Sequence, residues 1–354
     1  MSKVGWTWLR RAFLPASAAL LIAAAAVVPL PAYIERPGTA AGIPACVRIA
    51  QRPDAGVRGD FLFTTISRRE ATVFGVLAAA VRPKQRVVAN QEVLGTFRRD
   101  EYYRRQRQAF LDSTDRAVIV ALQAAGLPVR LSGGGVSVVE VLEGTPAEGV
   151  LQAGDVITQI DGSAVRTDME LIEAVSTGRT LRLGFRRDGR TRSATVRPER
   201  GTADVDRRPI IGVRITTFEP QVDLPFEVDV TSGEVGGPSA GLMIALAVFD
   251  LVDDSDLAAG RRIAGTGTLA LDGRVGPIDQ IELKVLVAAR SGAGVFVVPS
   301  SQAEVARAAV PASSDMRVIG VDTFADARTV LERPPVDLPD ERVASAPCQF
   351  SAAA

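Results

Sequence analysis

Gly236-Gly237-Pro238-Ser239-Ala240-Gly241 is the stretch of this 354-residue sequence that says most about its fold. A short run of β-forming residues precedes it, and the apolar periodicity after Ala240 predicts a helix that continues to Asp253. Ser239 is therefore expected at the start of a helix, where free N–H groups and the positive end of the helix dipole stabilise an oxyanion. The alternative interpretation is structural, because serine is also a common N-cap residue.

A second stretch, residues 263–289, predicts a hairpin followed by a buried helix. Asp272-Gly273 lies between alternating apolar residues, which is a strong hairpin signal. The helix after it carries Lys284 among apolar neighbours. A lysine on a helix is often a surface residue that extends its amine to solvent. Here, however, lysine occurs only three times among 41 basic residues, and lysine, unlike arginine, can become a neutral amine that acts as a base.

The composition excludes several classes of function. The chain has no histidine and two cysteines, which rules out Ser-His-Asp and Cys-His catalysis and the common zinc sites. Its formal net charge is zero, with 41 basic and 41 acidic residues, so no overall field attracts nucleic acid. We therefore expect no metal, no cofactor and no nucleic-acid partner.

The two stretches together resemble the proteolytic domain of Lon peptidases, in which the nucleophile lies in a Gly-Pro-Ser-Ala-Gly sequence and a lysine base follows a Gly-Arg-Val-x-Pro-Ile hairpin. This resemblance implies a Lon-type α/β domain over residues 205–333, with Ser239 as nucleophile and Lys284 as general base. Burial of the lysine would lower its pKa and leave it neutral. The supporting residues that the resemblance implies are Thr266, which would hydrogen-bond the lysine amine, and Gly237, Pro238 and Ala240, around which backbone N–H groups would hold the oxyanion.

Two further features bear on this resemblance. Glu234 lies near the position of an acidic residue in Lon enzymes. Lon is driven by an ATPase, whereas this sequence contains no Gly-Lys-Ser/Thr phosphate loop. We therefore expect no nucleotide partner and cleavage that does not require ATP.

The N-terminal region predicts a membrane anchor. Residues 13–34 carry no charged side chain, and a helix of that length spans roughly 30 Å, about the thickness of the hydrocarbon core of a bilayer. Basic residues precede it, so residues 1–12 are expected in the cytoplasm and the chain after Ile34 outside. A cleaved signal peptide is the alternative. We favour a retained anchor, since Leu30 occupies a position where cleavage requires a small side chain.

Residues 126–200 resemble a bacterial PDZ domain, through Gly154-Asp155-Val156-Ile157 and Ile160-Asp161-Gly162. Such a domain binds an extended peptide as an added strand and captures its terminal carboxylate on backbone N–H groups. The resemblance places that carboxylate loop at Gly133, Gly134, Gly135 and Val136. An ordinary glycine turn is the alternative.

Residues 35–125 are expected to form a linker, Glu35–Pro44, and a stem that packs on the peptidase domain. The stem contains a predicted helix, Arg98–Ala125, and a predicted strand region, Phe61–Val73. We expect this strand region to pair with the peptidase domain, which would make the PDZ-like domain an insertion. Residues 334–354 are expected to be a tail, and Cys46 and Cys348 are expected to form a disulfide outside the membrane.

The expected fold is α+β, with an N-terminal transmembrane helix, a PDZ-like β module and a C-terminal Lon-type proteolytic α/β domain. The whole chain resembles the YlbL-like, PDZ-containing Lon peptidases of Gram-positive and actinobacterial envelopes. The resemblance implies a membrane-anchored serine endopeptidase that acts on extracytoplasmic or membrane-associated proteins, with its catalytic domain on the extracytoplasmic side of the cell membrane. Two alternatives stay open here: a non-catalytic envelope scaffold that binds protein termini through the PDZ-like module, and a serine amidase that uses serine and lysine.

Overall fold

The computed structural model describes residues 26, 28–52, 55–82, 84–200, 208–231, 233, 235–253 and 255–332. It divides into two units: a discontinuous unit that ends at Leu127 and resumes at Phe226, and an inserted unit, Pro128–Pro225. The bounds differ from the predicted 126–200 and 205–333, because the strands before Pro225 pair within the inserted unit. Each unit is described here by itself.

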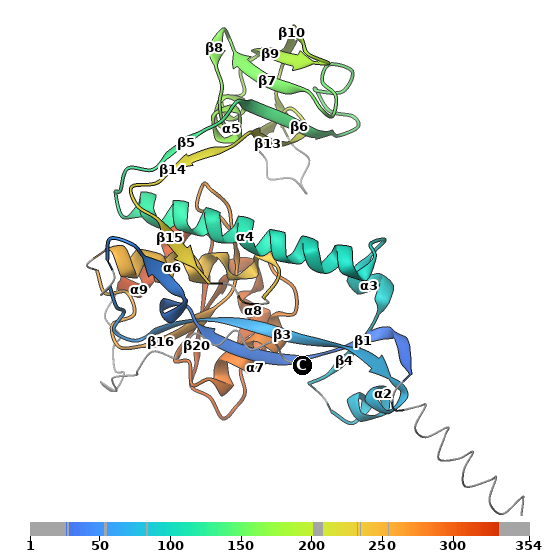
Figure 1. Ribbon diagram of the computed structural model, residues 1–354, viewed down its shortest axis with the longest axis vertical. Helices are drawn as coiled ribbons and strands as arrows, with labels where there is room; N and C mark the ends of the chain where they lie inside the picture. Colours follow the sequence, from blue (N-terminus) through green and yellow to red (C-terminus); the bar gives the residue numbers. More distant parts are fainter. Residues whose placement is uncertain are drawn as a thin grey trace, which may run out of the picture. The chain divides into compact units, whose positions relative to one another are not determined.

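A six-stranded sheet with the order β20-β19-β16-β3-β1-β4 forms the centre of the discontinuous unit (Figure 1). Neighbours from β20 to β3 are parallel, whereas β1 is antiparallel to both β3 and β4. The strands are β1 Pro29–Gly42, β3 Asp60–Thr72, β4 Arg86–Ala89, β16 Arg262–Gly265, β19 Val295–Pro299 and β20 Arg317–Val321.

The pairing of β3 with β16 joins the N-terminal region to the predicted peptidase domain. Phe61 lies opposite Ile263 in this pair, and both side chains are fully buried. The prediction that the Phe61–Val73 region pairs with that domain is therefore confirmed. Strands β1, β3 and β4 therefore belong to the same sheet as β16, β19 and β20 and do not form a separate stem.

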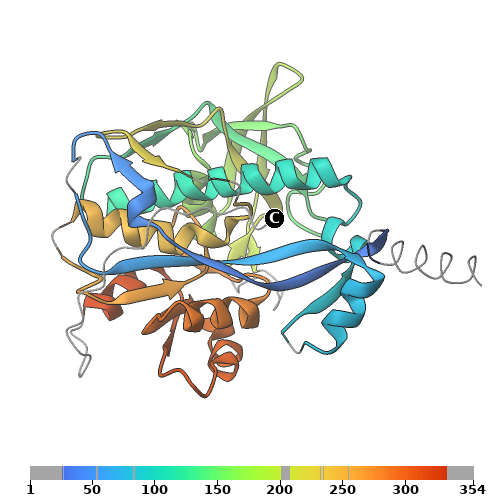
Figure 2. The same ribbon diagram turned by 60° about the horizontal axis from the view of Figure 1, so that its bottom comes forward.

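Helices cover both faces of this sheet (Figure 2). On one face α7 and α8 pack over β19 and β16, in a core that includes Val285, Phe296 and Ala306. On the other face α6 lies against β3, and α4 packs on α6. The second half of α4 buries Ala117, Val118, Ala121 and Leu122. The helices are α2 Val73–Ala80, α3 Asn90–Leu94, α4 Arg99–Ala124, α6 Gly241–Val252, α7 Ile281–Arg290, α8 Ala303–Ala309 and α9 Phe324–Glu332.

Short elements complete this unit. Strands β17 and β18 form the small hairpin predicted around Asp272-Gly273, and β2 pairs with β15. The bounds are β2 Val47–Ile49, β15 Val228–Val230, β17 Thr268–Leu269 and β18 Val275–Gly276, with 3-10 helices η1 Pro44–Cys46, η2 Pro238–Ala240 and η3 Ser300–Gln302.

Strand β1 changes the N-terminal prediction. Its first six residues, Pro29–Ile34, are the last six of the predicted transmembrane span, and the predicted linker Glu35–Pro44 continues the same strand to Gly42. Tyr33 and Ile34 are buried because β1 lies between β3 and β4. Apart from residues 26 and 28, the rest of the span lies outside the described residues. Among the helices that the structure describes, none has both the length and the apolar character needed to cross a bilayer.

The predicted disulfide can be followed at one end. Cys46, the last residue of η1, is buried and is disulfide-bonded. Cys348, like the rest of the predicted tail 334–354, lies outside the described residues, so its pairing with Cys46 stays a prediction.

The inserted unit has its own sheet, with the order β10-β9-β7-β6-β13, and its own core beneath helix α5. That core includes Val138, Ile157, Leu171 and Leu183. The elements are β5 Arg130–Ser132, β6 Gly135–Val141, β7 Val156–Ile160, β8 Ser163–Ala164, α5 Asp168–Ser176, β9 Leu181–Arg187, β10 Arg190–Val196, β11 Glu199–Arg200, β12 Pro209–Ile210, β13 Val213–Phe218 and β14 Gln221–Asp223.

Candidate active site

Ser239 lies in a tight turn that only glycine allows the chain to make. Gly237 has φ +89°, a left-handed conformation that residues with a side chain rarely adopt. A Cβ on Gly236 would lie 2.9 Å from Cβ of Gln106 on α4. The two glycines therefore let the turn pass close to α4, and η2 and α6 follow directly.

Helix α4 holds this turn from one side. The N–H of Gly237 donates to the carbonyl of Gln106 at 2.8 Å, and Ser113 Oγ donates to the carbonyl of Pro238 at 2.9 Å. A Cβ on Gly241 would lie 2.6 Å from Ser113 Oγ, so Gly241 is needed for the close approach. The helix predicted as part of a stem therefore positions the candidate nucleophile.

The loop after β16 holds the turn from the other side. Thr266 Oγ1 donates to the carbonyl of Ser239 at 3.0 Å, and the N–H of Gly267 donates to the same carbonyl at 2.9 Å. The backbone of Ser239 is thus fixed by two hydrogen bonds while its side chain faces the cavity. Preorganised geometry of this kind is what a nucleophile requires.

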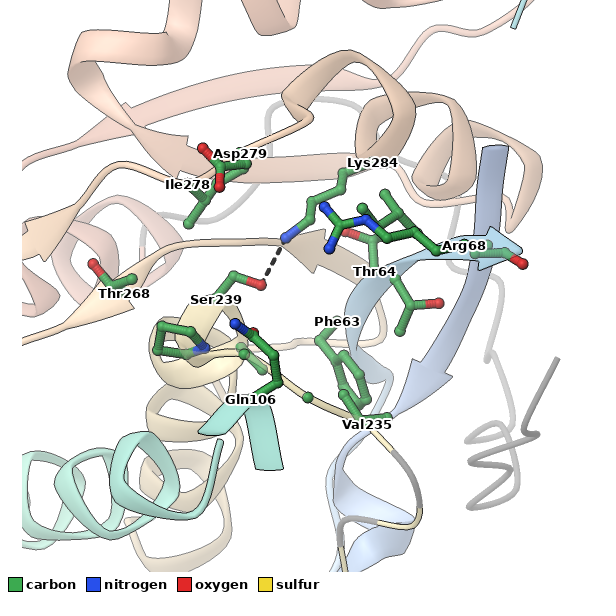
Figure 3. Close-up of a pocket in the computed structure, with 18 of the residues that line it drawn as sticks. Phe63, Thr64, Arg68, Gln106, Val235, Ser239, Thr268, Ile278, Asp279 and Lys284 are labelled. Carbon is green, nitrogen blue, oxygen red and sulfur yellow. Dashed lines mark hydrogen bonds between the residues drawn. The ribbon is translucent and has the colours of Figure 1, made fainter. Parts of the chain in front are cut away.

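Lys284 reaches Ser239 from α7 (Figure 3). Its Nζ lies 2.7 Å from Ser239 Oγ and 3.1 Å from Thr266 Oγ1. Lys284 is 5% exposed, since it lies one turn into a helix whose face packs on the sheet. The structure therefore brings together three of the residues singled out in the sequence: Ser239, Thr266 and Lys284.

Burial lowers the pKa of Lys284 from its ordinary value to about 8. Removal of the ammonium from water is the largest cause; the carboxylate of Asp279 opposes the shift, and the guanidinium of Arg68 adds to it. With this pKa, about a tenth of the lysine is a neutral amine at pH 7 and about half at pH 8. A neutral amine at hydrogen-bond distance from a serine hydroxyl can act as a general base.

A cavity of about 730 Å³ opens beside this pair. Its walls come from β1, β3, α4 and the turns before α6 and α7. Arg68 of β3 lies on the wall, where its guanidinium donates to Glu35 at 2.7 Å and to the hydroxyl of Tyr102 at 2.8 Å.

Arg68, Gln106 and Ser113 were not identified from the sequence. The sequence signal for them was the cluster of small residues around Ser239. It indicates that another segment of the chain packs closely against this turn, but it does not identify that segment.

The predicted oxyanion donors, the backbone N–H groups around Gly237 to Ala240, are not all available in the structure. The N–H of Gly237 is taken by Gln106, and Pro238 has no N–H. The first N–H groups of a helix have no partner within it, which leaves those of Ser239 and Ala240 as candidates. Glu234, the acidic residue considered upstream, lies outside the described residues.

The predicted carboxylate loop of the inserted unit is not an open site. Strand β6 lies between β7 and β13, and Val136 is fully buried. The N–H of Gly134 donates to the carbonyl of Phe218 at 2.8 Å, and a Cβ on Gly133 would lie 2.5 Å from Thr217 Cγ2. The assignment of peptide binding to Gly133–Val136 was wrong, because β13 returns from later in the chain and covers that edge.

Strand β13 is itself the last strand in the order of this sheet. It follows a turn at Gly212, which has φ +80°. The carbonyls of Ile211 and Gly212 accept from the N–H groups of Ala147 and Leu142, both at 2.9 Å, so these carbonyls are directed into the unit. Helix α5 begins beside the other end of β13, where Asp168 Oδ1 accepts from Thr217 Oγ1 at 2.9 Å. The outer edge of β13 is therefore the better candidate for strand addition.

Comparisons with known proteins agree with both units. Residues 123–197 match the PDZ domain model, and residues 218–332 match the model of the Lon protease (S16) C-terminal proteolytic domain. A Lon protease of Campylobacter concisus is 32% identical over 106 residues, which is 29% of this chain and 13% of that protein. A Lon protease of Roseiflexus castenholzii is 33% identical over 88 residues, 25% of this chain and 11% of that protein.

Among solved structures, the PDZ domain of an SdrC-like protein from Listeria monocytogenes is 28% identical in sequence to the matched part of this chain, with a TM-score of 0.22. The match covers 24% of this chain and 92% of the chain in that structure. The chain thus spans only about an eighth of the length of the curated relative from Campylobacter concisus. What is shared with the relatives is the proteolytic domain, and the nucleophile and lysine motifs lie within the matched residues. The matches therefore show a PDZ domain and a Lon-type proteolytic domain within one chain, which supports a PDZ-containing serine peptidase of the Lon type.

Proposed function

We propose that the chain is an ATP-independent serine endopeptidase that uses Ser239 and Lys284 as a catalytic dyad. The observation that carries the proposal is the 2.7 Å approach of Lys284 Nζ to Ser239 Oγ, made by a buried lysine whose pKa is lowered to about 8. The match to the Lon proteolytic domain supports the same chemistry.

In the first half of the reaction, the neutral amine of Lys284 takes the proton of Ser239 as Oγ attacks the peptide carbonyl. The developing oxyanion is held by the N–H groups of Ser239 and Ala240 at the helix start. The ammonium of Lys284 then gives its proton to the leaving amine, and the C–N bond breaks. Thr266, which accepts from Nζ, keeps the lysine aligned through both transfers.

In the second half, water replaces the leaving amine beside Lys284. The lysine takes a proton from this water as its oxygen attacks the carbonyl of the Ser239 ester. The bond between the acyl carbon and Oγ then breaks, the ammonium of Lys284 returns the proton to Oγ, and the acid product leaves. No carboxylate is needed as a third catalytic residue, because burial lowers the pKa of Lys284 and so gives a neutral amine that can take the proton.

We assign substrate recognition to the outer edge of β13. An extended peptide would add to β13, with its carboxylate at the turn of Ile211 and Gly212. Binding a terminus there would raise the local concentration of the same chain near Ser239. The substrates we propose are extracytoplasmic or membrane-associated proteins. The apolar residues before β1 anchor the chain, and the basic residues before them keep the N-terminus cytoplasmic.

A fluorophosphonate probe on the full chain tests the nucleophile. We expect labelling that Ser239→Ala abolishes, and cleavage of an unstructured peptide that does not change when ATP and Mg²⁺ are added. Lys284→Arg keeps the charge but cannot act as a base, so it should also be inactive. A folded chain that neither reacts with the probe nor cleaves peptides would favour the scaffold alternative.

A further inference from the structure

Helix α2, Val73–Ala80, is apolar all round. Its sequence is VFGVLAAA, without a polar side chain. One side packs on β1, where Gly75 and Ala79 are buried and a Cβ on Gly75 would lie 2.8 Å from Ile34 Cδ1. A helix that is apolar on every side is typical of a core or a membrane environment, yet α2 lies on the surface.

The outer side of α2 exposes large apolar side chains. Val73 is 41% exposed, Phe74 44%, Leu77 60% and Val81, directly after the helix, 79%. Residues 73, 77 and 81 follow the four-residue spacing of one helix face, and 74 lies beside them. Val87 of the neighbouring edge strand β4 is 45% exposed. We call these residues the α2 patch: Val73, Phe74, Leu77, Val81 and Val87.

The charged residues that follow α2 in the sequence, as far as β4, are all basic. From Ala71 to Gln91 the sequence contains no Asp or Glu, whereas Arg82, Lys84 and Arg86 are basic and exposed. An apolar surface with a basic rim is complementary to a bilayer that contains anionic headgroups.

The α2 patch also lies where the apolar N-terminal run enters the fold. Pro29, at the start of β1, is opposite Thr72 in the sheet, and Thr72 is the N-cap of α2. The 16 residues before Pro29, from Phe13 to Val28, are uncharged and mostly apolar. Any bilayer that holds this run is therefore within a few residues of α2.

We propose that the α2 patch is a membrane-docking surface, which inserts its apolar side chains into the interfacial layer of an anionic bilayer beside the N-terminal run. Such helices lie in the plane of the interface and bury about 5–10 Å of their apolar face. Docking would fix the orientation of the peptidase unit and keep its cavity at a defined height above the lipid. This docking rests on the proposed anchoring of the apolar N-terminal run and is independent of the catalytic role of Ser239 and Lys284.

A tryptophan reporter tests this in the full chain. Trp6→Phe and Trp8→Phe remove both native tryptophans, and Phe74→Trp then places a single one in the α2 patch. The matched control is Val305→Trp on α8, because Val305 is 47% exposed, close to the 44% of Phe74. Helix α8 packs beside β20, which is at the opposite edge of the sheet from β4. Each protein is reconstituted in phosphatidylcholine–phosphatidylglycerol vesicles, with or without bromine on the acyl chains.

The expected result is quenching of the tryptophan at position 74 by brominated lipid, with no quenching at position 305. Leu77→Glu, at a site 60% exposed, should reduce the quenching at position 74 without affecting circular dichroism. Equal emission at position 74 with and without bromine would overturn the proposal. So would emission that instead changes with protein concentration, because the patch would then be an interface between copies of the chain.

Discussion

Replacing Lys284 by methionine should abolish peptidase activity and stabilise the fold, by an amount that depends on pH. Above about pH 10.5 the lysine is neutral in both the folded and the unfolded chain, so its ionisation costs nothing. As the pH falls, the unfolded chain binds the proton first, because the folded pKa is lowered from 10.5 to about 8. Stability is therefore lost between these two values as the pH decreases.

The size of this cost follows from the shift in pKa. A difference of about 2.5 units corresponds to roughly 3 kcal/mol at pH 7, about 2 kcal/mol at pH 9 and about 1 kcal/mol at pH 10. Methionine fills a similar volume without a charge. The difference in free energy of unfolding between the Lys284→Met variant and the native chain should therefore decrease by roughly 2 kcal/mol from pH 7 to pH 10. Loss of the hydrogen bonds to Ser239 and Thr266 adds a contribution to this difference that does not change with pH.

Urea unfolding followed by circular dichroism measures this difference. The two units of the chain are expected to unfold separately, so the transition of the inserted unit, which lacks the substitution, serves as an internal reference. Lys84→Met is the matched control, because Lys84 is exposed and its replacement should have no pH-dependent effect. A stability difference for Lys284→Met that is the same at pH 7 and pH 10 would refute the argument that the buried amine is held neutral.

Three further predictions concern activity. The kcat/KM of peptide cleavage should rise with pH up to about 8 and then level off, and Asp279→Asn should move this midpoint to lower pH, since removing the carboxylate disfavours protonated Lys284. Gly241→Ala should lower kcat because its Cβ meets Ser113 Oγ at 2.6 Å, and adding Ser113→Ala should recover part of the loss; no recovery would exclude this contact as the cause. Replacing residues 128–225 by a flexible linker should spare cleavage of a short peptide and slow cleavage of a protein with a free C-terminus; equal rates on both substrates would contradict delivery through the inserted unit.

Local patterns identified the chemistry, because each half of the candidate site lies within one continuous segment. The glycine-rich turn before Ser239 and the hairpin before Lys284 are each encoded within a few residues. Turn and helix patterns of this short range can be recognised in a single sequence. Rarity of lysine in an arginine-rich chain added a chemical reason to single out Lys284. The tertiary structure added the 2.7 Å contact between them.

The errors came from pairings between distant segments. Gly133–Val136 has the composition of a carboxylate loop, but the free edge of a sheet depends on which strand pairs with it, and β13 comes from 80 residues later in the chain. Likewise, Pro29–Ile34 continues the apolar run before it, and only the pairing of β1 with β3 and β4 makes it a strand. An apolar run alone does not distinguish a buried strand from part of a membrane span.

The sequence by itself therefore predicted the peptidase class, the candidate catalytic residues Ser239 and Lys284, and the insertion of a PDZ-like domain. The tertiary structure decided which other segments build the site: α4 through Gln106 and Ser113, and β3 through Arg68. The physical reason is that the glycine-rich turn before Ser239 and the helix that carries Lys284 are set by local chain geometry. The burial that lowers the pKa of Lys284, the hydrogen bonds that fix Ser239 and the free edge that receives a peptide all depend on segments brought together by folding.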